Sequence, residues 1–128
     1  MPFKFLFCPT FKSEFEKILG TYPKSEERIQ EVISSLQNNP NQGTIYPGFG
    51  EITIRKVRIP LSEYKLSSSK GLRFIFLVSK EKNCLVPLCI YKKGAFKREQ
   101  QVKEQIKNNL KNILKEIDLD QCTSFLKE

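Results

Sequence analysis

Three apolar runs separated by polar segments are the feature of this sequence that most limits its fold. The runs cover residues 52–59, 72–78 and 85–91 and are rich in aliphatic, β-branched and aromatic residues, as β-strands are. Residues 65–71 and 79–83 between them are polar, which is typical of turns that connect neighbouring antiparallel strands. The sequence therefore predicts a three-stranded antiparallel meander.

The first of these strands changes character along its length. One face reads Ile52, Ile54, Lys56 and Arg58. The opposite face reads Thr53, Arg55, Val57 and Ile59. Because the apolar side switches partway, we expect a bulge or a strong twist within this strand. Pro87 lies inside the third strand, where it removes one donor from the hydrogen-bond ladder.

The residues before the meander predict a short strand and two helices. Alternating phenylalanines at residues 3–7 indicate the strand, which ends before Pro9. A first helix is expected from Thr10, as its N-cap, to Gly20, which we expect to end it in a left-handed conformation. A second begins after Ser25, and the two form a helical hairpin.

Residues after the meander follow a helical period. From Phe96, apolar residues recur at spacings of three and four, which predicts a long amphipathic helix. A break follows Asp118, with a last turn around Phe125 and Leu126. The length of 128 residues suits one domain. We therefore expect a single α+β domain over residues 1–128, with residues 96–128 as a C-terminal helical extension.

The chain contains no histidine, and this absence limits the chemistry open to it. Ser-His-Asp and Cys-His nucleophiles and most catalytic zinc sites need an imidazole. Acid and base steps must then use lysine, tyrosine or carboxylate side chains. Two acidic residues, Glu51 and Glu63, are carboxylate candidates for such a step.

Cysteine usage and the N-terminus bear on location. The four cysteines, Cys8, Cys84, Cys89 and Cys122, include no C-x-x-C pair, and we interpret them as buried free thiols. The N-terminal apolar stretch is interrupted by Lys4 and is too short for a signal sequence or a membrane span. Both observations favour a cytoplasmic protein with no membrane partner.

Positive charge is concentrated in the second part of the chain. The net charge is +8, and twelve lysines and arginines lie within residues 53–98 against only Glu63 and Glu81. Neighbouring strands of a meander bring such side chains onto one sheet face. A basic face with an aromatic ring suits RNA phosphates and an unpaired base. A solvated polar sheet face without a ligand is the alternative interpretation.

Five short motifs follow one another along the chain. They are Asn39-Pro40 with Gly43, Gly48-Phe49-Gly50, Arg55-Lys56-Val57-Arg58, Ser69-Lys70-Gly71-Leu72-Arg73, and Tyr91-Lys92-Lys93. In this order and spacing, residues 3–97 resemble the RelE/ParE superfamily of bacterial toxins, and most closely its HigB-like branch. The resemblance implies a RelE-like α+β fold with a short N-terminal strand, a two-helix hairpin, an antiparallel meander and a long C-terminal helix.

The resemblance also implies an activity. Such proteins are toxins of type II toxin–antitoxin pairs and cleave mRNA on the ribosome. The ribose 2′-hydroxyl attacks the adjacent phosphate, without a metal or another cofactor. The implied partners are mRNA on the ribosome and a cognate antitoxin protein with a helix-turn-helix DNA-binding region.

Site residues follow from the same motifs. The resemblance implies that Arg73 clamps the scissile phosphate and that Lys56 and Arg58 stabilise the transition state. Lys70 is then the general base, and Tyr91 stacks on the nucleotide or protonates the leaving oxygen. The surrounding RNA-binding residues are Arg55, Lys92, Lys93 and Lys97.

Three departures from the family pattern keep other functions open. Leu72 stands where a second glycine is usual, residues are added between Gly50 and Arg55, and Pro87 interrupts the last strand. The alternatives are a ParE-like inhibitor of DNA gyrase, which acts by protein contact, and a degenerate basic binding module without catalysis. The cluster of Lys70, Arg73 and Tyr91 favours the nuclease.

Overall fold

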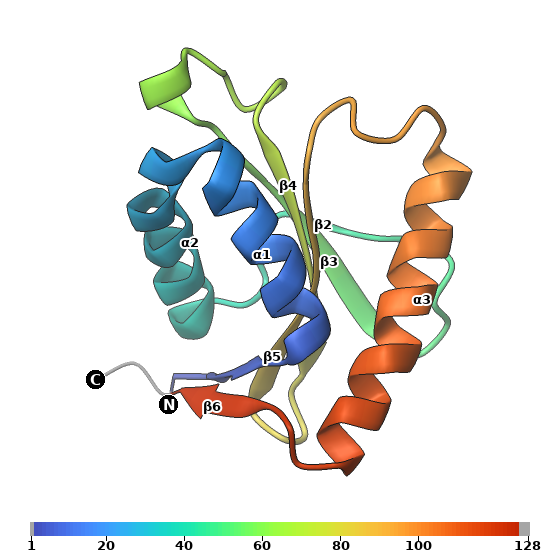
Figure 1. The fold of residues 1–128 in the computed structure, drawn as a ribbon. Coiled ribbons are helices and arrows are strands. Elements are labelled where there is room, and N and C mark those ends of the chain that lie inside the picture. The colour runs from blue at the N-terminus through green and yellow to red at the C-terminus, as the bar shows by residue number, and fades with distance from the viewer. Residues whose placement is uncertain (1, 126–128) are drawn as a thin grey trace.

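The computed structural model describes residues 2–125, which adopt a mixed α+β fold (Figure 1). The elements are β1 (Lys4–Phe7), α1 (Pro9–Thr21), α2 (Glu26–Asn38), β2 (Thr44–Ile45), β3 (Thr53–Ile59), β4 (Leu72–Ser79), β5 (Cys84–Lys92), α3 (Glu99–Asp118) and β6 (Thr123–Phe125). Single 3₁₀ turns, Pro23–Ser25 and Ser62–Tyr64, precede α2 and follow β3. The predicted α+β class is confirmed.

The strands form one sheet in the order β2-β3-β4-β5-β1-β6. Strands β3, β4 and β5 are antiparallel neighbours, so the predicted meander is confirmed. Strand β1 pairs with β5 in parallel, and β6 pairs with β1 in the antiparallel sense. The first and the last strand of the described residues therefore lie side by side at one edge of the sheet.

Helices cover both faces of this sheet, as Figure 1 shows: α1 and α2 lie on one side and α3 on the other. The first core joins Phe11 of α1 and Ile29 of α2 to Phe74 of β4. The second core places Ile106 of α3 against Ile75 of the same strand. The period of two along β4 explains why it supplies both cores.

Of the two features expected in the strand at residues 52–59, a bulge or a strong twist, the bulge is wrong. Pairing of β3 with β4 runs without a shift from Thr53 to Ile59. The register shift lies instead between β4 and β5, where Pro87 and Cys89 pair with successive residues of β4 and Leu88 is the extra residue. The face of β3 that turns toward α3 changes from apolar to basic: Ile54 is buried in the core that contains Ile106, whereas Arg58 on the same face is exposed.

Both predicted ends of the first helix are wrong. The helix begins at Pro9 with Cys8 in the N-cap position, since the fixed φ of proline suits the first helical residue. Thr10 lies inside the helix and donates its backbone N–H and its hydroxyl to Glu116 of α3. Gly20 stays helical, and α1 ends at Thr21.

The interpretation of all four cysteines as free thiols is also wrong. Cys8 and Cys122 form a disulfide with their Cα atoms 4.3 Å apart, whereas Cys84 and Cys89 are free. The cause is β6: Phe7 is paired with Thr123, so the next residue pair in the antiparallel register is Cys8 with Cys122. The region around Phe125 is thus a strand and not the expected turn, and Leu126 lies outside the described residues.

Candidate functional site

A cavity of about 160 Å³ opens beside the N-terminus of α3, on the sheet face that this helix covers. We call it the basic cavity. It is lined by Lys56, Arg58, Arg73, Tyr91, Lys93, Gly94, Phe96, Lys97, Arg98, Glu99 and Val102. Six of these side chains are cations and one is a carboxylate, so the cavity suits an anionic group.

The strand register builds the floor of the basic cavity. Arg58 of β3 pairs with Arg73 of β4, which pairs with Tyr91 of β5, so the three side chains stand in a row. Lys56 precedes Arg58 by two residues and shares its face. After β5 the chain turns at Gly94, whose φ of +95° favours glycine. It then returns as α3, which closes the cavity.

Arg58 is the cation of this row that is open to a ligand. Its side chain is exposed and makes no hydrogen bond or ion pair within residues 2–125. In that part of the chain the only ion pair joins Arg28 and Glu31 on α2, away from the cavity. A guanidinium without a protein partner can bind a phosphate through two parallel hydrogen bonds.

Arg73 is held in a different way. Only 4% of its surface is exposed, and its Nη1 and Nη2 atoms donate to the carbonyl oxygens of Ser68 (2.9 Å) and Ser69 (3.0 Å). Burial, together with the nearby charge of Arg58, lowers the pKa of Arg73. Arg73 therefore supplies positive charge beneath the cavity and fixes the loop between β3 and β4.

Tyr91 supplies an aromatic ring and a hydroxyl. Its ring meets that of Phe96 edge to face, with the ring centroids 5.0 Å apart. Burial is the main cause that raises the pKa of Tyr91 to about 12, and the negative charge of Glu99 adds to it. The hydroxyl is thus protonated at neutral pH and can donate a proton or a hydrogen bond.

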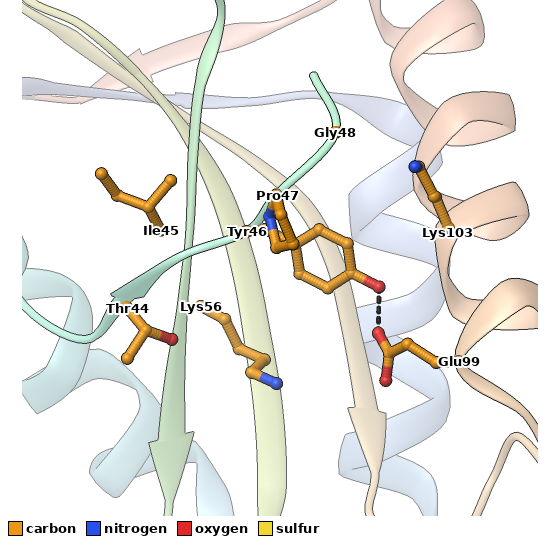
Figure 2. Close-up of a pocket in the computed structure, with 8 residues that line it drawn as sticks. All are labelled: Thr44, Ile45, Tyr46, Pro47, Gly48, Lys56, Glu99 and Lys103. Carbon is orange, nitrogen blue, oxygen red and sulfur yellow. Dashed lines mark hydrogen bonds between the residues drawn. The ribbon is translucent and has the colours of Figure 1, made fainter. Parts of the chain in front are cut away.

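A second cavity of about 400 Å³ adjoins the basic cavity and shares Lys56 and Glu99 with it. We call it the Tyr46 cavity. Its lining residues, drawn in Figure 2, are Thr44, Ile45, Tyr46, Pro47, Gly48, Lys56, Glu99 and Lys103. The Nζ atom of Lys56 lies 5.9 Å from the centre of the Tyr46 ring, within the range of a cation–π contact.

Glu99 is the functional candidate that sequence reasoning missed. It is the first residue of α3, and its Oε2 atom accepts a hydrogen bond from the Tyr46 hydroxyl (Figure 2). Burial and this bond raise the pKa of Tyr46. The signal available in the sequence was weak: one acidic residue directly after a basic run, at the start of a helix where the dipole favours negative charge.

The structure brings together part of the predicted site. Lys56, Arg58, Arg73, Tyr91, Lys93 and Lys97 all line the basic cavity. Arg55 lies on the opposite face of β3, where its guanidinium donates to the carbonyl oxygens of residues 41–43. Lys70, in the loop between β3 and β4, and Lys92, whose amine donates to the carbonyl oxygen of Lys93, do not line the cavity.

The two predicted carboxylate candidates also lie elsewhere. Glu63 belongs to a surface pocket with Glu26, Glu27 and Glu31 near the start of α2. Glu51 is exposed in the turn before β3 and lines neither the basic cavity nor the Tyr46 cavity. Glu99 is therefore the only carboxylate among the residues that line those two cavities.

One side-chain group in residues 2–125 has the composition of a metal site: Cys8, Glu116 and Cys122. Both sulfur atoms are joined in the disulfide, so neither is available as a thiolate ligand. Glu116 is near the C-terminus of α3, about 25 Å along the helix from Glu99. This group is separate from the basic cavity.

Comparisons with known proteins assign no family to this chain. No model of a known protein family matches the sequence, and no curated protein does so either. Within residues 2–125, none of the helices combines the length and the apolar character that crossing a membrane requires.

Proposed function

We propose that this protein is a metal-independent endoribonuclease with a RelE-like fold, the toxin of a type II toxin–antitoxin pair. The observation that carries the proposal is the row of Arg58, Arg73 and Tyr91 beside Lys56 in the basic cavity. Four of the five predicted catalytic residues meet there, although they come from three strands. The ordered motifs that resemble the HigB-like branch support the same function.

The proposed reaction uses the charge of the cavity. The ribose 2′-oxygen attacks the adjacent phosphorus, the bond to the 5′-oxygen breaks, and a 2′,3′-cyclic phosphate and a 5′-hydroxyl result. Arg58 and Lys56 bind the phosphate oxygens, whose negative charge grows in the transition state. Arg73 adds positive charge from below, and the protonated Tyr91 hydroxyl donates a proton to the leaving 5′-oxygen.

The cellular setting belongs to the same proposal. A toxin of this kind acts in the cytoplasm on mRNA bound to the ribosome, and a helix-turn-helix antitoxin silences it. The exposed cations at the mouth of the cavity, Lys93, Lys97 and Arg98, provide contacts for the phosphates on either side of the cleaved bond.

Primer extension on total mRNA after brief induced expression tests the proposal. We expect new 5′ ends within translated frames and growth arrest for the wild type. Arg58→Ala should reduce cleavage by a factor on the order of 10² to 10³, since it removes one transition-state donor. Lys82→Ala, in the exposed turn between β4 and β5, is the matched control and should cleave like the wild type.

Other outcomes point to the alternative functions. Growth arrest with intact mRNA and trapped DNA breaks indicates inhibition of DNA gyrase. A folded protein that binds RNA but neither cleaves it nor arrests growth indicates a binding module. Either outcome contradicts the proposed nuclease.

A further inference from the structure

We propose that Glu99 is the general base of this site and takes the proton from the attacking ribose 2′-hydroxyl. This inference rests on the proposed function, because it assigns a step of that reaction. It replaces the expectation that Lys70 is the base. Glu99 lines both the basic cavity and the Tyr46 cavity, together with the cations that would bind the scissile phosphate.

Few other groups in the cavities can accept a proton. Charged lysine and arginine side chains have no acceptor atom. Tyr46 donates its hydroxyl proton to Glu99, and Tyr91 is protonated at neutral pH because burial raises its pKa to about 12. Among the residues that line the two cavities, Glu99 is the only carboxylate. A carboxylate offers acceptor lone pairs on both oxygens.

The surroundings of Glu99 fix its carboxylate and still leave one oxygen open. Oε2 accepts a hydrogen bond from the Tyr46 hydroxyl, whereas Oε1 accepts no hydrogen bond from any group in residues 2–125. The start of α3 is itself fixed, because Oε1 of Gln101 accepts hydrogen bonds from the backbone N–H groups of Lys97 (3.0 Å) and Arg98 (3.2 Å). The side chain of Glu99 is exposed, so a ribose can reach Oε1.

The proton balance of the step is simple. Oε1 of Glu99 takes the 2′-hydroxyl proton as the new bond from 2′-oxygen to phosphorus forms. The bond from phosphorus to the 5′-oxygen breaks, and the leaving oxygen takes the proton of the Tyr91 hydroxyl. Solvent water then carries the proton from Glu99 and restores the one lost by Tyr91, so no oxidant, metal or other co-reactant is needed.

The charged and titratable residues that share the two cavities with Glu99 come from every element that lines them. They are Tyr46 from the turn after β2, Lys56 and Arg58 from β3, Arg73 from β4, Tyr91 from β5, Lys93, Lys97 and Arg98 from the loop before α3, and Lys103 from α3. Both tyrosines are protonated at neutral pH, because burial raises the pKa of each of them. Comparison of the pH–rate profiles of the wild type and Glu99→Gln therefore isolates the contribution of the carboxylate.

The test compares Glu99→Gln with the wild type in single-turnover cleavage of a short synthetic mRNA on ribosomes. The mRNA carries a cleavage site mapped by primer extension. We expect the variant to cleave 10² to 10⁴ times more slowly, the usual contribution of a general base. The wild-type rate should rise with pH because a general base acts in its deprotonated form, and the variant should lose this rise. Glu104→Gln, at an exposed position of the same helix, is the matched control.

Two further measurements separate base catalysis from binding and from acid catalysis. A copy of the mRNA with one 2′-deoxy residue at the cleavage site should resist cleavage and bind Glu99→Gln at least as tightly as the wild type, since the variant loses a negative charge. A 5′-bridging sulfur at the cleaved bond makes a leaving group that needs no proton. It should restore cleavage by Tyr91→Phe but not by Glu99→Gln.

The outcomes distinguish this inference from the proposed function. If the wild type cleaves and Glu99→Gln stays within threefold of its rate, Glu99 is not the base, although the nuclease stands. If the sulfur substitution rescues Glu99→Gln as well as Tyr91→Phe, Glu99 is not the base either. If the wild type does not cleave mRNA on ribosomes, both proposals fail.

Discussion

Arg73 and Arg58 are paired neighbours on the sheet, yet their guanidinium groups have different surroundings. Arg73 is buried and holds two loop carbonyls, whereas Arg58 is exposed and has no protein partner within residues 2–125. Because one is bound by the protein and the other is open to a ligand, the two arginines should respond differently to replacement by lysine.

Arg73→Lys should destabilise the fold. A lysine has one amine and cannot reach Ser68 and Ser69 with the fork geometry of a guanidinium. The loss of these bonds within a buried environment is expected to reduce the free energy of unfolding by about 1–3 kcal/mol. Arg58→Lys is the matched control and should change it by less than about 0.5 kcal/mol. Urea unfolding measures both, and equal effects of the two substitutions would contradict this division of roles.

Individual site residues were predictable where strand geometry alone decides their place. The period of two within a strand puts Lys56 and Arg58 on one face, and the meander brings Arg73 and Tyr91 beside them. Glu99 could not be placed in this way. Its position depends on the path of the loop after β5 and on the angle at which α3 returns, which local sequence patterns do not specify.

At the level of elements, α1, α3 and β5 are joined by polar side chains. Strand β1 pairs with β5 only at Cys84 and Leu85, so the backbone groups of β5 further on need other partners. The Glu14 carboxylate accepts the N–H of Ile90 (3.1 Å), and the Asn109 side chain donates to the carbonyl oxygen of Leu88 (2.8 Å) and to Glu14. Helical periodicity predicted these helices, but it could not show that polar side chains complete the edge of the strand.

Asn109→Ala tests this junction of elements. Asn109 is 3% exposed, and its loss leaves the Leu88 carbonyl and one Glu14 oxygen short of a donor. We expect the free energy of unfolding to fall by about 1–3 kcal/mol. Asn108→Ala, on the exposed side of α3, should have an effect within about 0.5 kcal/mol. Thermal unfolding of both variants measures the difference. If both variants unfold with the same free energy, the hydrogen bonds of Asn109 contribute little to stability and the prediction is wrong.

For the whole molecule, the sequence indicated the α+β class, the meander and the long C-terminal helix, because each of these depends on a strong period within a continuous segment. Strands β2 and β6 have two and three residues, too few to show a period. The disulfide was missed for the same reason. Cys8 and Cys122 are 114 residues apart, and only the pairing of β6 with β1 brings them together.

This bond closes almost the entire chain into a loop, so its main effect should be on global stability. A disulfide restricts the unfolded chain and commonly contributes about 2–4 kcal/mol, so Cys8→Ser or a reducing agent should lower the Tm by on the order of 10 °C. Cys84→Ser is the matched control, because Cys84 is free and only partly buried, and it should leave the response to the reducing agent unchanged.

The same experiment connects the disulfide to the proposed setting in the cytoplasm, where such bonds are rare. Thiol titration of the denatured, unreduced protein should find two free thiols, those of Cys84 and Cys89. Because Cys8 and Cys122 lie at the opposite end of α3 from Glu99, reduction should leave cleavage unchanged at temperatures well below the Tm. Four free thiols and a Tm that does not respond to reduction would show that the two sulfur atoms are not bonded in solution, and the fold would then depend on its two cores and the sheet alone.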